Sequence, residues 1–275
     1  GGAARAAACA AHAETAFDTC VAPARAVSDG LIVCAGDEAD ARGALATAGA
    51  ALRFAAALAA KRGVTLSARC ASRMAATTSS LAPLLTLETI NASSPSLCAA
   101  ACVAVFVPAC DLLTAVLRAR KREIKRCAAL VVASCATLLD ALRAWNAVRV
   151  APDSPSTDPP RLDSADTETV DRACRRGGAA LACVYEEAVA SGLDRYCAHL
   201  LADAVTCASG GAAGVGPAAA AALKPGIFAL VDACGDREIG QMHAAFGSQA
   251  GGARRVALAA LVEEHKRAHK YDGKV

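Results

Sequence analysis

The chain has 275 residues, of which 55% are hydrophobic and only 3% aromatic, and its formal net charge at pH 7 is +3. Much of the hydrophobic fraction is alanine, which favours helix but buries little area per residue. Runs of β-branched and aromatic residues, which would predict strands, are scarce. The composition therefore predicts an all-α protein. The weak net charge by itself does not indicate a nucleic-acid partner.

Residues 1–94 form an alanine-rich segment in which we expect helices at about residues 3–20 and 39–62. The stretch between them, Val21 to Gly36, contains Pro23 and is expected to be a loop. The chain does not begin with methionine, so we expect it to be part of a longer protein. The sequence does not indicate what precedes it.

Residues 95–275 form the second predicted segment, a helical domain that starts at Ser94-Pro95, a pair typical of a helix N-terminus. Its first helix is expected to kink at Pro108 and to end near Arg120. A second helix begins near Glu123, and we expect the two to pack as an antiparallel pair. The second helix has an apolar stripe at 4-3-4-3 spacing, which comprises Val131, Cys135, Leu138, Leu142 and Trp145.

The run from Pro95 to Leu117 is apolar enough to resemble a membrane span. It contains Pro108 and Asp111, and a charge near the centre of a span costs about 2.5–3.5 kcal/mol on insertion scales. We therefore predict a buried core helix and no membrane partner.

Residues 151–169 contain four prolines and five carboxylates against a single basic residue. Such a stretch cannot build a core, so we predict a disordered acidic loop inserted in the helical domain. Helix is expected to resume from Asp171 to Ala190 and from Leu193 to Cys207. After a glycine-rich loop, Pro217 is expected to restart helix, and the Pro225-Gly226 step is expected to break it.

The sequence contains fourteen cysteines but no C-x-x-C pair. The closest two, Cys98 and Cys102, are four residues apart in an apolar run. Most of the others lie among alanine, leucine and valine, where cysteine behaves as a small buried hydrophobe. We predict buried free thiols in a reducing compartment rather than disulfides or a zinc site.

Two basic clusters are candidate contacts for RNA phosphates or protein partners. The first lies between the two helices of the second segment and comprises Arg118, Arg120, Lys121, Arg122, Lys125 and Arg126. The second lies toward the end of the chain and comprises Lys266, Arg267, Lys270, Tyr271 and Lys274. The first cluster is also compatible with a nuclear localisation signal or with a solvated helix connection. The second is also compatible with basic residues that complement a helix dipole.

The sequence lacks the patterns that predict catalysis, since G-x-x-x-x-G-K-[ST], G-x-S-x-G and H-E-x-x-H do not occur. His265 and His269 are four residues apart and would share one face of a helix. Two imidazoles can bind zinc, but a site needs further ligands. We therefore interpret these histidines as a packing edge of the last helix, and we predict no metal, no cofactor and no enzymatic activity.

Leu223 to Cys234 combines a Pro-Gly step, an aromatic residue and a Leu-Val-Asp-x-Cys run, and the chain ends in His269-Lys-Tyr-Asp-Gly-Lys-Val275. These motifs resemble the C-terminal domain of the unhealthy ribosome biogenesis protein 2 family, the nucleolar 27S pre-rRNA processing proteins. The resemblance is specific over residues 194–275 and weaker over 95–193, and it is not visible over 1–94. Its signature positions are Pro225, Gly226, Asp232 and Gly273. We expect Pro225-Gly226 to set a sharp corner between helices, and Asp232 to cap a helix or contact a partner.

The resemblance implies an α-solenoid-like array of helical hairpins that acts as a non-catalytic scaffold in nucleolar assembly of the large (60S) ribosomal subunit. It also implies partners among pre-60S assembly factors, including a second large helical scaffold and a DEAD-box helicase, with pre-rRNA as a possible further contact. The alternative from the residues alone is a generic helical-repeat adaptor unrelated to ribosomes. An enzyme that uses a cysteine or a metal is a third hypothesis.

Overall fold

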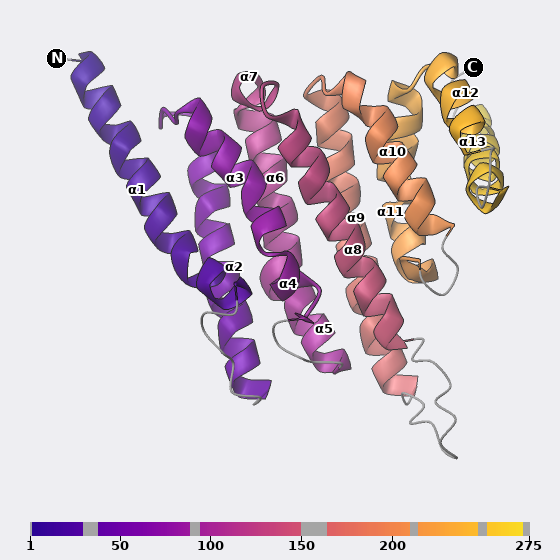
Figure 1. Cartoon of the computed structure of the whole chain (residues 1–275), viewed down its shortest axis with the longest axis horizontal. Helices are drawn as coiled ribbons and strands as arrows, with labels where there is room; N and C mark the ends of the chain where they lie inside the picture. Colours follow the sequence, from indigo (N-terminus) through magenta and orange to yellow (C-terminus); the bar gives the residue numbers. More distant parts are fainter. Residues whose placement is uncertain are drawn as a thin grey trace.

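The alanine-rich, strand-poor sequence folds into helices, and the all-α prediction is confirmed (Figure 1). The computed structural model describes residues 2–29, 38–88, 94–149, 164–209, 214–246 and 252–271. Within these ranges, there is no strand. The two ends of the chain lie at opposite ends of the long axis (Figure 1).

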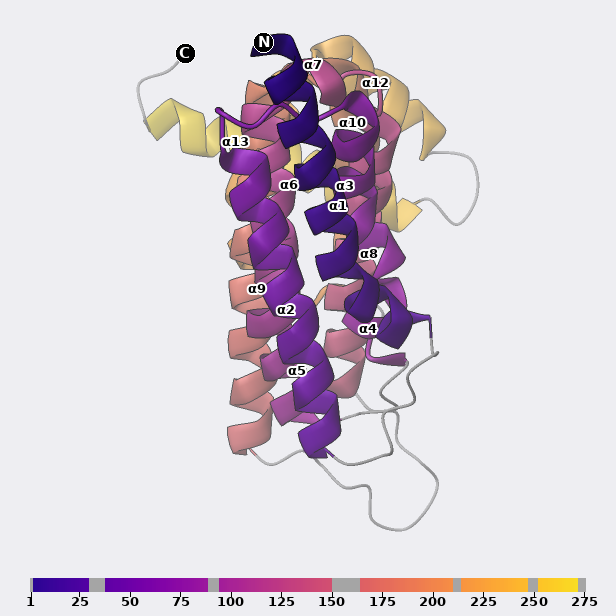
Figure 2. The same cartoon turned by 90° about the vertical axis from the view of Figure 1, so that its left-hand side faces the viewer.

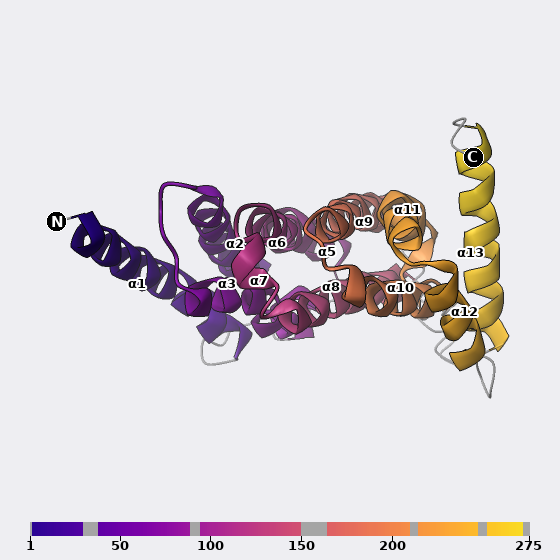
Figure 3. The ribbon, with the colours of Figure 1, turned by 90° about the horizontal axis from the view of Figure 1, so that it is seen from above.

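Most helices lie in two facing layers that run along that axis, as the view from above shows (Figure 3). One layer contains α2 (Glu38–Ala60), α5 (Pro95–Ala101) continuing through η2 (Cys102–Phe106) into α6 (Val107–Ala119), then α9 (Ser164–Ala190) and α11 (Gly216–Ala233). The other contains α3 (Ala68–Ser80), α8 (Ala128–Arg149) and α10 (Asp194–Ala208), with α1 (Gly2–Ser28) at the N-terminal end. Three short helices connect longer ones along the chain: α4 (Ala82–Leu85), α7 (Lys121–Ile124) and α12 (Asp236–Ala245). The solenoid-like description stays a prediction.

The last helix, α13 (Gly252–Tyr271), lies crosswise to both layers at the C-terminal end (Figures 2 and 3). It contacts α10 and α11. Among its described side chains, only Leu258 is buried. Ala257, Leu261 and Val262 are half-buried against the core, so α13 buries less apolar surface than the other long helices and its polar contacts carry more weight.

One hydrophobic cluster of buried side chains extends from Ala13 in α1 to Leu258 in α13. Near its middle, the rings of Phe106 and Trp145 lie 5.2 Å apart, and Trp145 Nε1 donates a 3.0 Å hydrogen bond to the carbonyl oxygen of Leu85. The cluster crosses the predicted boundary between residues 1–94 and 95–275, so these two segments share a single core.

The first predicted loop is wrong in its N-terminal half, because α1 continues through Pro23 to Ser28. A proline inside a helix costs about 3 kcal/mol through a lost hydrogen bond and a steric clash. The apolar side chains around it offset this cost, since Val21, Ala24 and Val27 are all buried. Residues 30–36 of the predicted loop lie outside the described residues.

The helix start at Ser94-Pro95 is confirmed, and the π-helical turn η2 directly precedes the segment with Pro108, where we predicted a kink. Pro108 has no N–H to donate to the carbonyl four residues earlier, and a π turn accommodates such a gap. The apolar stripe of the next helix, α8, is buried as predicted. The two helices on either side of the basic turn lie in facing layers, and Phe106 of η2 contacts Trp145 of α8. The nearest backbone neighbours of α6 are α2 and α9, and those of α8 are α3, α9 and α10.

The predicted acidic loop begins outside the described residues, which resume at Ser164. Residues 164–169 form the first turns of α9, so the loop ends earlier than we expected. Asp166 in the first turn complements the positive end of the helix dipole, which explains why this acidic sequence is helical.

By length and apolarity alone, three helical stretches are long enough to cross a membrane: α2, Pro95–Ala119 and α8. In the most apolar part of Pro95–Ala119, 61% of the residues are buried inside the protein. Much of this apolar surface is therefore already covered by neighbouring helices.

Candidate functional site

The first basic cluster lies where the C-terminus of α6 meets α7, at one end of the stacked helices (Figure 1). Arg120 is only 7% exposed, and its guanidinium donates to the carbonyl oxygens of Ala59 at 3.1 Å and Lys61 at 3.0 Å. Lys121 Nζ donates to the carbonyl oxygen of Ala190 at 3.0 Å. The last carbonyls of a helix have no intrahelical donor, so these two side chains satisfy the C-termini of α2 and α9.

The remaining members of this cluster are exposed. Arg118 forms an ion pair with Glu187 at 2.8 Å, and its side chain is 66% exposed. The side chains of Arg122, Lys125 and Arg126 have no hydrogen-bond or ion-pair partner among the described residues. We call Arg118, Arg122, Lys125 and Arg126, together with Arg62 on the same surface, the cationic end.

Arg62, which follows α2, contributes to the same surface. It lines a hollow of about 370 Å³ together with Arg118, Ala119, Arg120, Lys121, Arg122 and Glu123. A second hollow of about 250 Å³ is lined by Ala68, Arg122, Glu123 and Arg126. The guanidinium group presents several donors in a planar fork that matches phosphate geometry, so this end can bind phosphate groups.

The second basic cluster lies on α13 and is only partly described. Lys266 and Arg267 are exposed, and both interact within the helix: Lys266 Nζ lies 3.4 Å from Glu263 Oε1, and Arg267 Nε donates to the carbonyl oxygen of Glu263 at 3.2 Å. The backbone of Lys270 and Tyr271 completes α13. The side chains of these two residues, together with Gly273 and Lys274, lie outside the described residues.

The predicted corner at Pro225-Gly226 is wrong, because α11 runs without interruption from Gly216 to Ala233. The chain turns later, at Cys234-Gly235, where the axes of α11 and α12 differ by 110°. Cys234 is extended there, with ψ at 124°. The break therefore lies at the end of the signature segment instead of at its start.

Gly226 has a packing role against α9. A Cβ atom at Gly226 would lie 2.5 Å from Ala182 Cα, and one at Gly178 would lie 2.5 Å from the carbonyl oxygen of Ala219. Two glycines on opposite helices thus let the backbones of α9 and α11 approach closely. This close packing offsets the hydrogen bond that Pro225 removes from the interior of α11.

The opposite face of α11 holds α13. Lys224, Phe228 and Asp232 recur every four residues and so share one face. Lys224 Nζ lies 2.6 Å from Glu264 Oε1, and the ring of Phe228 lies edge-on to that of His265 at 5.3 Å. The signature segment therefore packs against α9 with one face and against α13 with the other. We call the second contact the α11–α13 junction.

Asp232, His265 and His269 meet at this junction. His265 Nε2 lies 2.8 Å from Asp232 Oδ1, and His269 Nε2 lies 3.5 Å from Asp232 Oδ2. The two imidazole rings are 4.1 Å apart. The sequence indicated the four-residue spacing of the histidines, but the carboxylate is on another helix, so only the fold brings the three groups together.

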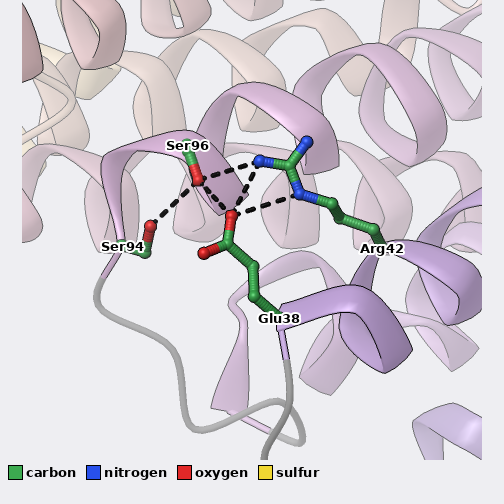
Figure 4. Close-up of polar contacts among 4 residues, drawn as sticks. All are labelled: Glu38, Arg42, Ser94 and Ser96. Carbon is green, nitrogen blue, oxygen red and sulfur yellow. Dashed lines mark hydrogen bonds and ion pairs between the residues drawn. The ribbon is translucent and has the colours of Figure 1, made fainter.

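A further polar cluster joins the N-termini of α2 and α5 (Figure 4). Glu38 Oε1 accepts hydrogen bonds from Ser96 Oγ at 2.5 Å and from Arg42 Nη2 at 2.7 Å. Ser94 Oγ lies 3.1 Å from Ser96 Oγ. Hydrogen bonds from Ser96 and then Arg42 lower the pKa of Glu38. Because each of the four side chains bonds to another member of the cluster, we interpret it as a polar contact that joins the two helices.

Most of the cysteines in the described part of the chain are buried thiols. All thirteen described cysteines are free, and nine of them are buried, as expected. Cys127 and Cys183 lie in apolar runs that predicted burial, but Cys127 is half-buried and Cys183 is exposed. Burial raises the pKa of Cys102 to about 12 and that of Cys135 to about 12. Such thiols stay protonated at neutral pH, and the thiol is a poor nucleophile compared with the thiolate.

Two layers of helices around one hydrophobic core define the class of this chain, an all-α protein. The family model described as the Urb2/Npa2 family matches residues 51–274, so the chain belongs to this family of ribosome biogenesis factors. The family resemblance seen in the sequence is thereby confirmed, and the match extends into α2, where the sequence had shown us none. Neither the curated proteins nor the solved structures contain a match.

Proposed function

We propose that this chain is a non-catalytic scaffold in the nucleolar assembly of the large ribosomal subunit, where 27S pre-rRNA is processed. Membership of the Urb2/Npa2 family supports a role in ribosome biogenesis. The fold supports the scaffold role, because stacked helices present long surfaces to partners and the buried thiols offer no nucleophile. The partners we propose are pre-60S assembly factors, among them a large helical scaffold and a DEAD-box helicase, and not a membrane.

The observation that carries the RNA part of this proposal is the cationic end. Three of its members, Arg122, Lys125 and Arg126, are exposed and have no acidic partner among the described residues. Unpaired surface cations that contact phosphates release counterions, so they bind RNA without sequence specificity. We therefore propose that pre-rRNA is bound at the cationic end, while assembly factors bind along the helical layers.

The proposal can be tested in cells in which a tagged full-length protein replaces the endogenous one and can be depleted. We expect nucleolar fluorescence, co-sedimentation with pre-60S particles and accumulation of 27S pre-rRNA when the protein is depleted. A variant with Arg122→Glu, Lys125→Glu and Arg126→Glu should keep its assembly-factor partners but lose crosslinks to pre-rRNA.

The matched control carries Arg53→Glu, Arg172→Glu and Arg175→Glu, which reverse three exposed arginines away from the cationic end. It should crosslink normally. A protein that is excluded from the nucleolus, or whose sedimentation is insensitive to RNA digestion and to depletion of pre-60S particles, would favour a helical adaptor unrelated to ribosomes.

A further inference from the structure

We propose that Asp232, His265 and His269 form a binding site for a zinc-type divalent metal ion that clamps α13 to α11. One carboxylate oxygen and one ring nitrogen from each histidine all lie within 4.8 Å of one another. The site lies at the α11–α13 junction, far along the chain from the cationic end, and it does not depend on the proposed role in ribosome assembly.

The positions of the three groups fit a shared ion. Tetrahedral zinc lies about 2.0–2.2 Å from nitrogen and oxygen ligands, which places neighbouring ligand atoms roughly 3.3–3.5 Å apart. His265 Nε2 lies 2.8 Å from Asp232 Oδ1, below that range, and His269 Nε2 lies 3.5 Å from Asp232 Oδ2, at its upper end. The side chains would have to adjust by less than about 2 Å for one ion to reach all three, because no two of the ligand atoms are more than 4.8 Å apart. The ion would take the place of the proton that His265 and Asp232 share in their hydrogen bond.

The ligand types select the class of metal. Two imidazoles and one carboxylate suit zinc and the neighbouring transition metals, whereas magnesium and calcium prefer oxygen ligands alone. Three protein ligands leave one position of a tetrahedral ion open. Asp232 is 53% exposed and His269 is 30% exposed, so water or a partner's side chain can reach that position.

The surroundings hold two of the three ligands in place. The His265 side chain is only 12% exposed and packs against the edge of Phe228. Asp232 stands on α11, whose opposite face is packed closely against α9 through Gly226. About two turns earlier on α11, Lys224 pairs with Glu264, the residue before His265, and this contact also joins α13 to α11. A metal site needs this kind of prior order, because its ligands must be positioned before the ion arrives.

The clamp has a clear structural purpose. Among the described side chains of helix α13, only Leu258 is fully buried, and Leu261 and Val262 are half-buried, so its hydrophobic packing is weaker than that of the core helices. A metal bridge between residues 33 positions apart in the chain would suppress the local opening of α13. Metal availability would then regulate whether the C-terminal helix is docked.

Metal binding to the purified 275-residue chain is the direct test. The protein is stripped with a chelator, exchanged into metal-free buffer under reducing conditions and titrated with Zn²⁺, with Co²⁺ as a spectroscopic substitute. We expect one equivalent to bind, and Co²⁺ to give the visible absorption of a tetrahedral site. In Asp232→Asn and His269→Gln, the affinity should fall by at least the roughly 10- to 100-fold that loss of an outer-shell partner causes.

The control variant is His243→Gln, which alters a histidine on α12 that lies outside the cluster. It should bind the ion like the parent chain. Hydrogen exchange adds a second readout: Zn²⁺ should slow exchange in α13 of the parent chain and leave exchange unchanged in His269→Gln. Because His269 is partly exposed, this variant is expected to fold, and circular dichroism checks that it does.

Two results would overturn the metal site. One is the absence of stoichiometric binding to the parent chain. The other is equal binding to the parent chain, Asp232→Asn and His269→Gln, which would place the ion on cysteine thiols elsewhere. Neither result bears on nucleolar localisation or on pre-rRNA crosslinking, so failure of the clamp and failure of the scaffold proposal are distinguishable.

Discussion

The cationic end and the α11–α13 junction both carry charged side chains on helices, but they use charge differently. At the cationic end, Arg120 is buried against the C-terminus of α2, whereas Arg122, two residues later, is exposed and unpaired in the described structure. At the α11–α13 junction, charged groups of one helix meet charged groups of the other, as Lys224 meets Glu264. Paired charges stabilise the position of a helix, and unpaired charges remain available to a partner. Substitutions can therefore separate the two roles.

The largest expected effect comes from the packing beneath the junction. In Gly226→Ala, the new methyl group would overlap the backbone of Ala182, so α9 and α11 must move apart. We expect a loss of about 3 kcal/mol in the free energy of unfolding, measured by denaturant titration. Gly240→Ala is the matched control, because a Cβ atom there meets nothing within 4 Å. It should stabilise α12 by about 0.5–1 kcal/mol. Equal effects at both glycines would contradict the close packing of α9 on α11.

The next effect distinguishes Arg120 from Arg122. Arg120→Met keeps much of the aliphatic volume but removes both hydrogen bonds to the end of α2, so we expect it to lower the free energy of unfolding by about 2 kcal/mol. Arg122→Met should change it by less than about 0.5 kcal/mol, as for most exposed positions. Thermal unfolding of the two variants measures the difference. Similar stabilities would mean that Arg120 does not support α2.

The third effect is on binding rather than on stability. Reversing Arg122, Lys125 and Arg126 to glutamate should weaken binding to single-stranded RNA by about tenfold or more, which corresponds to about 1.4 kcal/mol per factor of ten. Fluorescence anisotropy at several salt concentrations is the measurement. The slope of log affinity against log salt should become shallower by about 0.7 for each phosphate that the variant no longer neutralises. An unchanged salt dependence would contradict the proposal that RNA binds at the cationic end.

The smallest effect belongs to the ion pair of the junction. The Lys224 and Glu264 side chains are 39% and 47% exposed, so solvent screens their attraction. Lys224→Ala should therefore cost less than about 1 kcal/mol in global stability, yet hydrogen exchange in α13 should become faster. Lys266→Ala is the control, because Lys266 interacts with Glu263 of the same helix. If α13 exchanges equally fast in both variants, Lys224 does not hold it.

Local sequence signals predicted well wherever a feature depends on residues close together in the chain. Ser94-Pro95 begins a helix, and the stripe from Val131 to Trp145 is buried as its spacing indicated. The same local reasoning failed at Pro23 and Pro225, which lie inside helices. The cost of an internal proline is a local quantity, whereas the burial that offsets it comes from other helices.

The candidate sites show the same division. The run from Arg118 to Arg126 was visible as a basic cluster, but nothing in it distinguishes Arg120, which is buried, from its exposed neighbours. The spacing of His265 and His269 placed them on one face of a helix, yet their carboxylate partner lies on α11.

The sequence by itself determined that the chain is helical, that most of its described thiols are buried and that it belongs with ribosome biogenesis factors. Composition, helical periodicity and a contiguous motif are sufficient for these conclusions, because each depends on neighbouring residues. Only the tertiary structure decided that Gly226 contacts α9, that Arg120 stabilises α2 and that Asp232 meets two histidines. Each of these features needs two segments at contact distance, and a single stretch of sequence does not specify which segments meet.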